Sequence, residues 1–508
     1  MALLFDHLNF AYDSSPTDLI RDLTAHIPTG WTGVVGVNGA GKTTLLELAT
    51  GRLTPVTGSV RRRDPAVYCA QRTAAAPAEL PQFAADLGAR AHTLRRQLGV
   101  DDEWSARWAT LSHGERKRAQ LAVALWAEPA VLAVDEPTNH LDEDATRLIA
   151  AALKAYRGVG LLVSHDRALL DALCTQCIFF EGSGSIRLRP GNYSCGDAER
   201  QREIAHVRRE HDVAAAELNR LRREQTARRA AADAAHGKRS GRDLERHDSD
   251  GRERLRLAIL SGKDGRAGRS LKQIERRVDR ARESVDALRP QKLEHAGIWL
   301  HTEPSPRATL VSSPGGRLEL GPGRQLTFPA LALGPTDRVA LTGPNGSGKS
   351  SLVRHILERL QSQPHGVPAE RLVYIPQEIS AGECVAALAA VKATAAHTRG
   401  RLMAVVSRLN SQPQRLLDSR LPSPGEARKL LFTLGVVRTP YIVIMDEPTN
   451  HLDLPAIQCL EDALIDIPCA LLLVSHDRRF LGRLCQTEWR LRPSGDAVDL
   501  EVRRLEGR

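Results

Sequence analysis

The 508-residue sequence is poor in aromatic side chains, which make up only 4% of it. It also lacks an uncharged apolar run of the ~18 to 20 residues that a membrane-crossing helix needs. Met1 is followed directly by LLFDHLNFAY, without the basic segment, long apolar segment and cleavage site that direct secretion. Of the eight cysteines, only Cys174 and Cys177 form a CxxC pair, and no second pair completes a metal site. These absences predict a cytoplasmic protein with reduced thiols and no membrane partner.

Positive charge is in excess. The sequence carries 71 Lys and Arg against 61 Asp and Glu, which gives a formal net charge of +10. Such an excess fits a polyanionic partner, although charge alone does not name one. The apolar content of 42% and the charged content of 26% are those of a soluble globular chain, and 508 residues correspond to about three domains.

The two halves of the chain repeat one another. Glu136 and His165 are 29 residues apart, as are Glu447 and His476. Three motifs recur with them: GVNGAGKTT (36–44) and GPNGSGKSS (343–351), LAVDEPTNHLD (132–142) and VIMDEPTNHLD (443–453), and LLVSHDR (161–167 and 472–478). Matched motifs at matched spacing predict two homologous domains.

The motif-bearing strands predict the fold class. Segments such as YIVIM and ALLLV are continuous apolar runs that alternate with longer helical stretches. This pattern is typical of a mainly parallel sheet covered by helices on both faces. We expect an α/β fold with two P-loop nucleotide-binding domains at residues 1–195 and 298–508, joined by a linker at 196–297.

The pattern GxxxxGK[ST] occurs in each half, after an apolar strand and before a helical stretch. Its glycines allow backbone N–H groups to surround phosphates at a helix N-terminus. Lys42 and Lys349 would bind the β- and γ-phosphates of ATP, while Thr43 and Ser350 would bind Mg²⁺. The expected ATP-binding residues of the two loops are Gly36, Asn38, Gly39, Gly41, Lys42, Thr43 and Thr44, and Gly343, Asn345, Gly346, Gly348, Lys349, Ser350 and Ser351.

An acidic pair ends one apolar strand in each half. Asp135 and Asp446 are placed to hold the hydration shell of Mg²⁺. The residues that follow them, Glu136 and Glu447, are placed to orient or deprotonate an attacking water, because phosphoryl transfer depends on positioning and charge neutralisation. We therefore assign the two glutamates as catalytic residues.

Histidine and glutamine follow further strands of the repeat. His165 and His476, within SHD, lie at a constant distance from the acidic pairs, which favours a catalytic contact with the γ-phosphate or with water. Gln71 and Gln377 follow the strands VYCA and VYIP and would bridge Mg²⁺ and the water. A glutamine at the end of a strand would not by itself indicate a nucleotide-binding site.

With these motifs the two halves resemble ATP-binding-cassette (ABC) nucleotide-binding domains, and the most specific motif is the signature, LSHGE at 111–115 and SPGE at 423–426. The resemblance implies an intramolecular head-to-tail sandwich with two composite ATP sites. One site would join Lys42, Gln71, Glu136 and His165 with Ser423 and Gly425, and the other would join Lys349, Gln377, Glu447 and His476 with Ser112 and Gly114. His113 replaces a frequent glycine of the family, and Pro422 replaces a leucine.

An aromatic residue upstream of the phosphate loop normally stacks on adenine in this family. Tyr12 stands 24 residues before Gly36 and fits this role. The second half has no aromatic residue at that distance, since Phe328 is 15 residues before Gly343. Both catalytic glutamates are nevertheless present, so we expect both sites to hydrolyse ATP.

The segment between the halves is basic and helical in pattern. Residues 197–290 hold 25 Lys and Arg, 18 Asp and Glu, a single proline at the end, and no Phe, Tyr or Trp. Two apolar seams with heptad steps run through it, at Ile204, Val207, His211, Ala214, Leu218 and Leu221, and at Leu271, Ile274, Val278, Ala281, Val285 and Leu288. Pairing residue 204 with 288 and 221 with 271 predicts an antiparallel hairpin centred near Arg246.

The distal end of this hairpin, 222–270, is expected to meet structured nucleic acid. Its Lys and Arg residues would contact phosphates, and Leu255, Leu257, Ile259 and Leu260 would shape the tip. Stacking of bases on aromatic side chains is not expected, because the segment has none. A solvated charged linker is the alternative interpretation.

Duplicated cassettes joined by a basic helical hairpin, with DEPTNHLD in both halves, resemble the ABC-F family over essentially the whole chain. The resemblance implies a monomer that enters the ribosomal E site with ATP bound, directs its linker at the P-site tRNA and the large-subunit rRNA of the peptidyl-transferase centre, and leaves after hydrolysis. The interval of 41 residues from Gln71 to Ser112 leaves no room for the inserted arm of some housekeeping members. The long linker instead is similar to members that protect ribosomes from antibiotics.

Two alternatives remain open at this point. The protein would be a housekeeping translation ATPase that acts on stalled ribosomes, or the ATPase subunit of a drug exporter whose membrane part is another chain. The exporter does not require a basic hairpin.

Overall fold

A computed structural model describes residues 2–13, 18–139, 141–181, 185–237, 263–288, 303–321, 323–362, 367–409, 411, 413–419, 422–450, 452–495 and 497–505; the side chains of 231–237, 263–269, Arg408 and Pro424 are not described. The expected tip residues Leu255, Leu257, Ile259 and Leu260 lie outside these ranges. Contacts divide the chain into two units, Met1–Gly196 with Glu294–Arg508, and Asp197–Leu293.

The first cassette contains a small antiparallel sheet, in the order β2-β1-β4, and a larger sheet in the order β5-β6-β7-β3-β8-β9. Its strands are β1 (Leu3–Phe10), β2 (Ile20–Ile27), β3 (Gly30–Gly36), β4 (Thr57–Arg61), β5 (Ala66–Cys69), β6 (Val131–Asp135), β7 (Val159–Val163), β8 (Cys174–Glu181) and β9 (Ser185–Pro190). Its helices are α1 (Lys42–Thr50), α2 (Leu80–Ala85), α3 (Ala89–Leu98), α4 (His113–Trp126), α5 (Glu143–Lys154) and α6 (Arg167–Leu173).

The second cassette is built around one large sheet in the order β11-β12-β19-β18-β14-β17-β16-β15, with β10 and β13 paired separately. Its strands are β10 (Val311–Ser313), β11 (Gly316–Gly321), β12 (Arg324–Phe328), β13 (Leu331–Leu333), β14 (Arg338–Thr342), β15 (Leu372–Ile375), β16 (Ile442–Asp446), β17 (Ala470–Val474), β18 (Thr487–Ser494) and β19 (Ala497–Arg504). Its helices are α10 (Lys349–Ser362), α11 (Ala381–Ala393), α12 (Ala396–Arg408), α13 (Pro413–Asp418), α14 (Pro424–Val436), α15 (Leu454–Ile465) and α16 (Arg478–Leu484).

The centre of each large sheet is parallel, which confirms the predicted α/β class. The phosphate-loop strand β3 pairs in parallel with β7 and β8, and β14 pairs in parallel with β17 and β18. Every residue of β6, β7, β16 and β17 is buried, as expected for strands with both faces covered. Because parallel strands end at one edge of a sheet, the motifs that follow these strands meet there.

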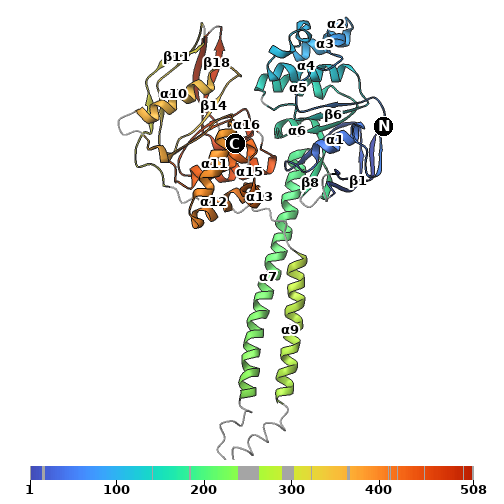
Figure 1. Cartoon of the computed structure of the whole chain (residues 1–508), viewed down its shortest axis with the longest axis vertical. Helices are drawn as coiled ribbons and strands as arrows, with labels where there is room; N and C mark the ends of the chain where they lie inside the picture. The colour runs from blue at the N-terminus through green and yellow to red at the C-terminus, as the bar shows by residue number, and fades with distance from the viewer. Residues whose placement is uncertain are drawn as a thin grey trace, which may run out of the picture. The chain divides into compact units, whose positions relative to one another are not determined.

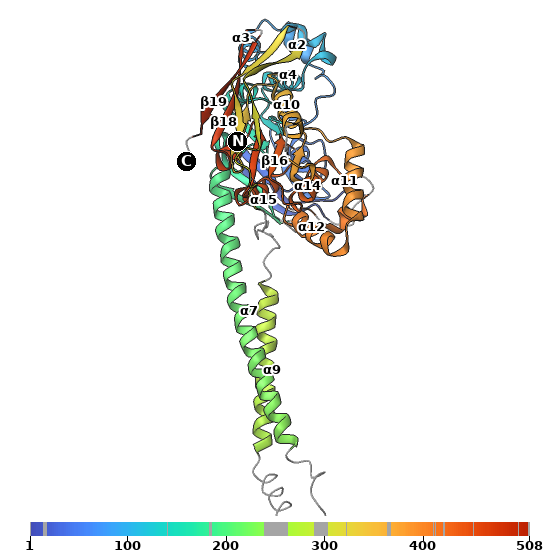
Figure 2. The same ribbon diagram turned by 90° about the vertical axis from the view of Figure 1, so that its left-hand side faces the viewer.

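Each cassette also has a group of helices beside its sheet. One helix of each group, α4 or α14, begins at the signature motif. In the second cassette α11, α12 and α14 gather next to the sheet (Figure 2) and enclose a core of Leu388, Val391, Leu402, Val406 and Leu430. In the first cassette α2, α3 and α4 pack through Phe83, Leu94, Leu98 and Ala119. The signature helices α4 and α14 are thereby fixed in hydrophobic cores.

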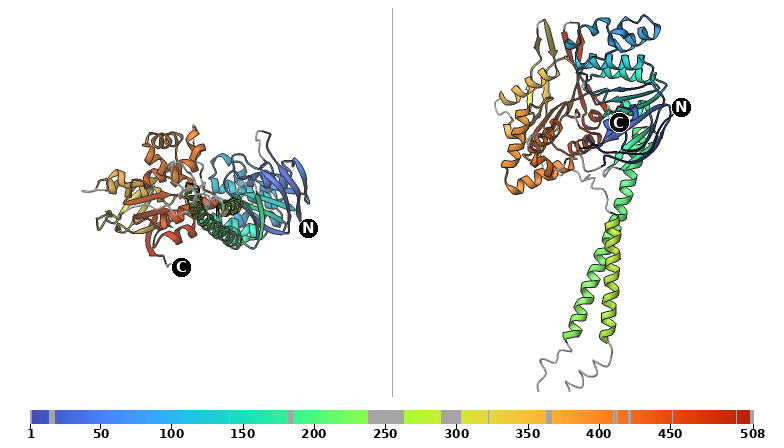
Figure 3. Two further views of the ribbon diagram at one scale, coloured as in Figure 1. Left: turned by 90° about the horizontal axis from the view of Figure 1, so that it is seen from below. Right: turned by 45° about the vertical axis from the view of Figure 1, so that its right-hand side comes forward.

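The second unit consists of most of α7 (Tyr193–Gly237) and of α9 (Lys263–Ala287), which run alongside one another (Figures 1 and 3) and overlap when the view is turned by 90° (Figure 2). At 1.5 Å per residue the 45 residues of α7 extend about 68 Å. The predicted seam residues from Ile204 to Leu288 are all partly or fully buried, while most of their neighbours are exposed. The helical hairpin predicted from the heptad pattern is therefore confirmed.

The pairing of the two helices differs from the predicted one. Arg228 donates a hydrogen bond of 2.7 Å to the hydroxyl of Ser270, and the numbers of these two residues add to 498 instead of 492. The stem also continues beyond Leu221 on α7, and α9 begins eight residues before Leu271. Gly265 and Gly268, which we assigned to the distal end, thus lie inside a helix. A helix tolerates isolated glycines, so these two residues did not mark its end. The heptad seam alone did not determine the register of the two helices.

Candidate nucleotide-binding sites

The first phosphate loop connects β3 to α1. Lys42 begins α1, and its Nζ atom donates hydrogen bonds to the carbonyl oxygens of Gly36 (2.8 Å) and Val37 (3.1 Å). Gly41 has a φ of 104°, and a Cβ atom there would lie 2.9 Å from the side chain of Leu19. A left-handed backbone beside a close neighbour admits only glycine. The loop therefore curves around the lysine ammonium group and ends at a helix N-terminus, which is a favourable place for phosphate.

The second loop repeats this arrangement between β14 and α10. Nζ of Lys349 donates hydrogen bonds to the carbonyl oxygens of Gly343 (2.7 Å) and Pro344 (3.1 Å). It also lies 3.2 Å from Nε2 of His476. Gly348 has a φ of 93°, and a Cβ atom there would lie 2.6 Å from Leu320. Both loops thus have the shape that the repeated motif predicts, with the lysine at the start of the following helix.

The proposed magnesium ligands face one another in both halves. The hydroxyl of Thr43 donates a hydrogen bond of 2.7 Å to Oδ2 of Asp135, and the hydroxyl of Ser350 donates one of 2.9 Å to Oδ2 of Asp446. Both aspartates are buried at the ends of their strands. A hydroxyl and a carboxylate at this separation form the oxygen-rich environment that Mg²⁺ prefers, so the residues fit the ion.

The two catalytic glutamates are buried in a strained conformation. Glu136 is 4% exposed with a φ of 46°, and Glu447 is 5% exposed with a φ of 49°. Positive φ angles in residues other than glycine cost on the order of 1 to 3 kcal/mol and gather at functional sites. Burial raises the pKa of Glu136 to about 7, and it raises the pKa of Glu447 well above its usual range. Such groups are poised to accept a proton near neutral pH.

The burial of Glu136 predicts a stability effect that is independent of turnover. The folded state holds the proton more tightly than the unfolded state, whose pKa is 4.5, so stability is lost as pH rises from 4.5 through about 7. Above pH 8 the wild-type protein should be less stable than Glu136→Gln by on the order of 3 kcal/mol. Thermal unfolding in EDTA without nucleotide, at pH 5 and pH 8.5, measures the difference; an advantage of the glutamine variant that is equal at both pH values contradicts the burial argument.

The histidines contact the glutamates from the neighbouring strand. Nε2 of His165 lies 3.1 Å from Oε1 of Glu136, and Nε2 of His476 lies 3.5 Å from Oε1 of Glu447. Burial, reinforced by the charge of Lys349, lowers the pKa of His476 to about 4. His476 is therefore neutral at physiological pH, and its Nε2 atom can accept a hydrogen bond from Lys349. Histidine, glutamate and phosphate-loop lysine form one cluster in the second cassette.

The glutamines and the signature serines are placed at exposed turns. Gln71 and Gln377 each follow a strand by two residues and are exposed. Ser112 and Ser423 are the N-cap residues of α4 and α14, where each forms a reciprocal capping box with the glutamate three residues later. Gly114 and Gly425 lie in the first turns of these helices. Within the described part of the chain no hydrogen bond joins Ser423 to Lys42 or Ser112 to Lys349, so the composite sites stay a prediction.

The substitutions in the signature motif are accommodated locally. Pro422 is buried, as Leu111 is at the equivalent position, so the proline fills the space of the usual leucine. His113 is exposed at the start of α4, with Nδ1 at 3.4 Å from the hydroxyl of Thr73. Neither residue disturbs the capping of its helix.

The expected adenine contacts differ between the halves. Tyr12 is 42% exposed, and its hydroxyl lies 2.9 Å from Oγ1 of Thr44, the third residue of α1. Its ring packs edge-on against Phe10 at 5.0 Å. Phe328 is instead 4% exposed and packs against His355 in the core of the second cassette. Tyr12 can therefore offer a ring face to a base, and Phe328 cannot.

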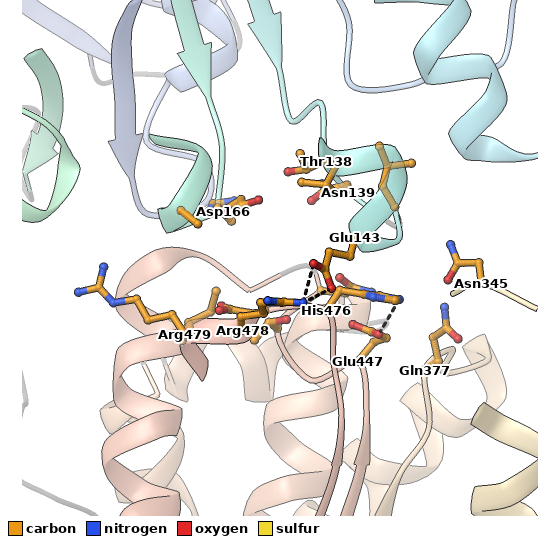
Figure 4. A pocket seen from close by; sticks show the side chains of 18 of the residues that line it. Thr138, Asn139, Glu143, Asp166, Asn345, Gln377, Glu447, His476, Arg478 and Arg479 are labelled. Atoms are coloured by element: carbon orange, nitrogen blue, oxygen red, sulfur yellow. Dashed lines mark hydrogen bonds and ion pairs between the residues drawn. The ribbon is translucent and has the colours of Figure 1, made fainter. Parts of the chain in front are cut away.

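A pocket brings the second phosphate loop together with residues of the first cassette. Gln377, Glu447, His476 and Lys349 line it, which unites four of the predicted residues of that site. Figure 4 shows Thr138, Asn139 and Asp166 of the first cassette on the opposite side, with Glu143 pointing at Arg478. The residues that line the pocket from the first cassette are Thr138, Asn139, Leu141, Glu143, Thr146, His165, Asp166 and Ala168.

Two aspartates that the sequence analysis missed contact the opposite phosphate loops. Oδ2 of Asp453 accepts a hydrogen bond of 2.9 Å from the backbone N–H of Asn38, and Oδ2 of Asp142 accepts one of 3.3 Å from the N–H of Asn345. The other oxygen of each aspartate caps its own helix, α15 or α5. No role was predicted from the sequence for the final Asp of DEPTNHLD, although the residue is present in both halves. Its contact with the other cassette was not predictable, because that contact is non-local.

The ion pairs between the cassettes are not symmetrical. Arg167 follows the first SHD motif, and its guanidinium binds both carboxylate oxygens of Glu461 and lies 3.3 Å from Asp477. Arg167 is 3% exposed and Glu461 is fully buried. The equivalent Arg478 pairs at 2.6 Å with Glu143, and both side chains are exposed. The ion pair on one side of the pseudo-symmetric interface is therefore buried, and the ion pair on the other side is exposed to solvent.

This asymmetry predicts unequal effects of matched mutations. Arg167→Met leaves the buried charge of Glu461 with fewer partners and should destabilise the protein by about 3 kcal/mol. That loss corresponds to a decrease of roughly 6 to 12 °C in the unfolding midpoint of a domain of this size. Arg478→Met removes an exposed pair and should change stability by less than about 1 kcal/mol. Differential scanning calorimetry of both variants compares them directly, and equal losses would refute the asymmetry.

Geometry and fold together define the class of protein. Two α/β cassettes with parallel central strands each carry a phosphate loop, a hydroxyl–aspartate pair and a buried glutamate beside a histidine. This arrangement is that of tandem P-loop ATPases of the ATP-binding-cassette type. In the part of the chain that the structure describes, none of the helices has the length and apolar character required to cross a bilayer, and none of its His, Cys, Asp and Glu residues gather as a separate metal site.

Comparisons with known proteins place the chain within this class. The profile of the ABC transporter family matches residues 20–139 and 329–450. The chain is 30% identical to the tylosin resistance ATP-binding protein TlrC of Streptomyces fradiae, over 91% of this chain and 92% of that protein. It is 26% identical to the ribosome protection protein VmlR of Bacillus subtilis, over 94% and 84%. The chain belongs to the ABC-F family of ATP-binding proteins, as the sequence motifs predicted.

The fold is also similar to that of a solved tandem-cassette protein. The archaeal ribosome recycling factor aABCE1, in its crystal structure with the ribosomal stalk protein aP1, has a TM-score of 0.61 and 18% identity, with 97% of this chain and 89% of that chain covered. At this identity the similarity shows the fold alone.

Proposed function

We propose that this protein is a ribosome-protecting ATPase. With ATP bound, the two cassettes close and the protein occupies the ribosomal E site. The helical hairpin then reaches towards the P-site tRNA and the rRNA of the peptidyl-transferase centre, which restores translation in the presence of an antibiotic. Hydrolysis of ATP releases the protein. It acts as a monomer in the cytoplasm.

The observation that carries this proposal is the basic helical hairpin between two cassettes, each of which has a phosphate loop with a glutamate and a histidine beside it. Residues 197–290 have a net charge of +7 and, in the described ranges, form two long paired helices whose arginines are mostly exposed. Phosphate contacts of Lys and Arg supply most of the affinity of proteins for nucleic acid. The similarity to TlrC and VmlR extends through this segment, since it covers more than nine-tenths of the chain.

Each proposed step of hydrolysis has a residue in place. Lys42 and Lys349 bind the phosphates at the start of α1 and α10. Mg²⁺, held by Thr43 and Asp135 or by Ser350 and Asp446, would neutralise phosphate charge. Glu136 and Glu447 orient the water and receive its proton, and the neighbouring histidines contact the γ-phosphate.

Gln71 and Gln377 complete the two sites in this proposal. From the turns after β5 and β15 they would contact Mg²⁺ and the attacking water. Ser112 with Gly114, and Ser423 with Gly425, bind the γ-phosphate held by the opposite cassette. Tyr12 stacks on adenine in the first site.

Co-sedimentation with ribosomes tests the proposed partner. The protein should sediment with ribosomes when ATP is present, and much less with ADP or without nucleotide. Binding should weaken as salt is raised, because Lys and Arg release counterions from RNA phosphates. An interaction that is absent with every nucleotide, under low salt, contradicts the proposal.

The two alternatives make different predictions. A housekeeping translation ATPase would also bind ribosomes, but its removal would alter basal translation and leave drug tolerance unchanged. An exporter subunit would lower the drug content of cells, whereas a ribosome-protecting protein leaves drug accumulation unchanged. Measurement of intracellular antibiotic in expressing and control cells separates export from protection.

A further inference from the structure

A buried lysine connects three functional elements of the first cassette. Lys117 lies in α4, five residues after Ser112, and is 1% exposed. Its Nζ atom donates a hydrogen bond of 2.7 Å to the carbonyl oxygen of Ala70, directly before Gln71. It donates a second one of 3.2 Å to the carbonyl oxygen of Asp135, directly before Glu136. One ammonium group therefore joins the signature helix to the backbone of the glutamine turn and of the acidic strand.

A buried arginine makes the equivalent connection in the second cassette. Arg428 lies in α14, five residues after Ser423, and is 3% exposed. Its guanidinium donates hydrogen bonds to the carbonyl oxygens of Gln377 (2.7 Å), Glu447 (3.0 Å) and Asn450 (2.6 Å). The arrangement is thus present twice, with a different cation in each half.

Such cations are energetically unusual, which argues that they serve more than packing. Lys and Arg are almost never fully buried unless they are paired. Lys117 and Arg428 donate these hydrogen bonds to backbone carbonyl oxygens, so each charge is held by the segments that carry the catalytic side chains. An apolar residue of similar length would fill the same space without this desolvation penalty, but it would remove one donor from each of these carbonyl oxygens.

We propose that Lys117 and Arg428 are positioning residues that couple the two ATP sites to each other. This inference rests on the proposed function, in which the signature serine of one cassette binds the nucleotide of the other. Helix α4 would then present Ser112 to the second site while Lys117 holds Gln71 and Glu136 of the first. Helix α14 would present Ser423 to the first site while Arg428 holds Gln377 and Glu447 of the second.

The geometry suits such transmission. Lys117 and Ser112 are about 7.5 Å apart along the axis of one rigid helix. A shift of the helix that follows docking of the serine therefore moves the cation and the carbonyl oxygens bonded to it. Displacement of a catalytic group by about 1 Å costs on the order of 100-fold in rate, so small shifts are sufficient.

Single-site variants test the coupling. In Glu447→Gln only the site with Glu136 hydrolyses ATP, and in Glu136→Gln only the site with Glu447 does so. Lys117→Met should lower kcat by about tenfold or more in both backgrounds, with KM little changed. A cation that merely supports its own cassette would lower kcat only in Glu447→Gln, and that result overturns the proposal. If neither parent variant hydrolyses ATP, the proposed activity itself fails.

The chain offers its own conservative replacements. Lys117→Arg and Arg428→Lys place in each cassette the cation that the other uses, so both should fold and recover most of the turnover lost in the methionine variants. Arg428→Lys should lose more than Lys117→Arg, because one ammonium group has fewer donors than the guanidinium that bonds three carbonyl oxygens. Lys154→Met, at the exposed end of α5, controls for loss of a lysine charge. Turnover that stays low in both swapped variants overturns the proposal.

Discussion

Replacing Glu136 and Glu447 together with glutamine should lower ATP turnover by at least ~100-fold, which is the usual contribution of a positioned general base. Glutamine preserves the shape of the side chain but cannot accept the proton of the attacking water. ATP binding should persist, because Lys42 and Lys349 are hydrogen bonded to their own loops and do not depend on the glutamates. Phosphate release and nucleotide affinity, measured on the same preparation, check both parts.

The same double variant should remain on ribosomes. Since hydrolysis is the proposed release step, the variant with ATP should co-sediment with ribosomes more completely than the wild-type protein and should inhibit translation. Each single variant serves as a control, because it measures how much its own site contributes to total ATP turnover. Turnover that is undiminished in the double variant would refute the assignment of both catalytic residues.

Replacement of residues 238–262 by a short glycine–serine loop should abolish drug protection and leave ATP turnover intact. Helix α7 ends at Gly237 and α9 begins at Lys263, so the paired stem is retained, including the hydrogen bond between Arg228 and Ser270. The removed segment contains seven Lys and Arg residues and the apolar residues expected to shape the tip. The cassettes keep every residue of both ATP sites, so their chemistry should not change.

Growth at increasing antibiotic concentration, together with ATPase assays of the purified variant, measures the effect of this replacement. A variant that restores the full tolerance of the wild-type protein contradicts a role of the distal end in protection. Unchanged tolerance combined with altered basal translation would favour the housekeeping alternative.

The sequence predicted those features of the site that depend on local order. Thr43 and Asp135 meet because a loop and a strand end lie at one edge of a parallel sheet, and His165 reaches Glu136 from the adjacent strand for the same reason. The buried positions of the helical seam were likewise predictable from the sequence, because burial in a paired helix follows the heptad steps. Motif, strand and helix are sufficient for these contacts.

Contacts between distant segments were not predictable in this way. Asp453 of the second cassette contacts Asn38 of the first, and Arg167 of the first cassette contacts Glu461 of the second. No role was predicted from the sequence for Lys117, because its hydrogen bonds to the carbonyl oxygens of Ala70 and Asp135 join segments that are distant in the sequence. The predicted register of α7 and α9 was wrong for a related reason. A heptad seam matches its partner again after a shift by one heptad, so the seam alone allows several registers. The hydrogen bond from Arg228 to Ser270 indicates which of them is formed.

The central claim, ATP-dependent protection of the ribosome, is tested most directly by purified translation with the wild-type protein, ATP, a reporter message and, in turn, tylosin and a lincosamide, a streptogramin and a pleuromutilin antibiotic. The account predicts that the protein raises severalfold the concentration of at least one of these antibiotics that is needed for half-inhibition, and that the variant lacking residues 238–262 does not. An inhibition curve that the wild-type protein leaves unchanged, for tylosin and for lincosamide, streptogramin and pleuromutilin antibiotics alike, would contradict it.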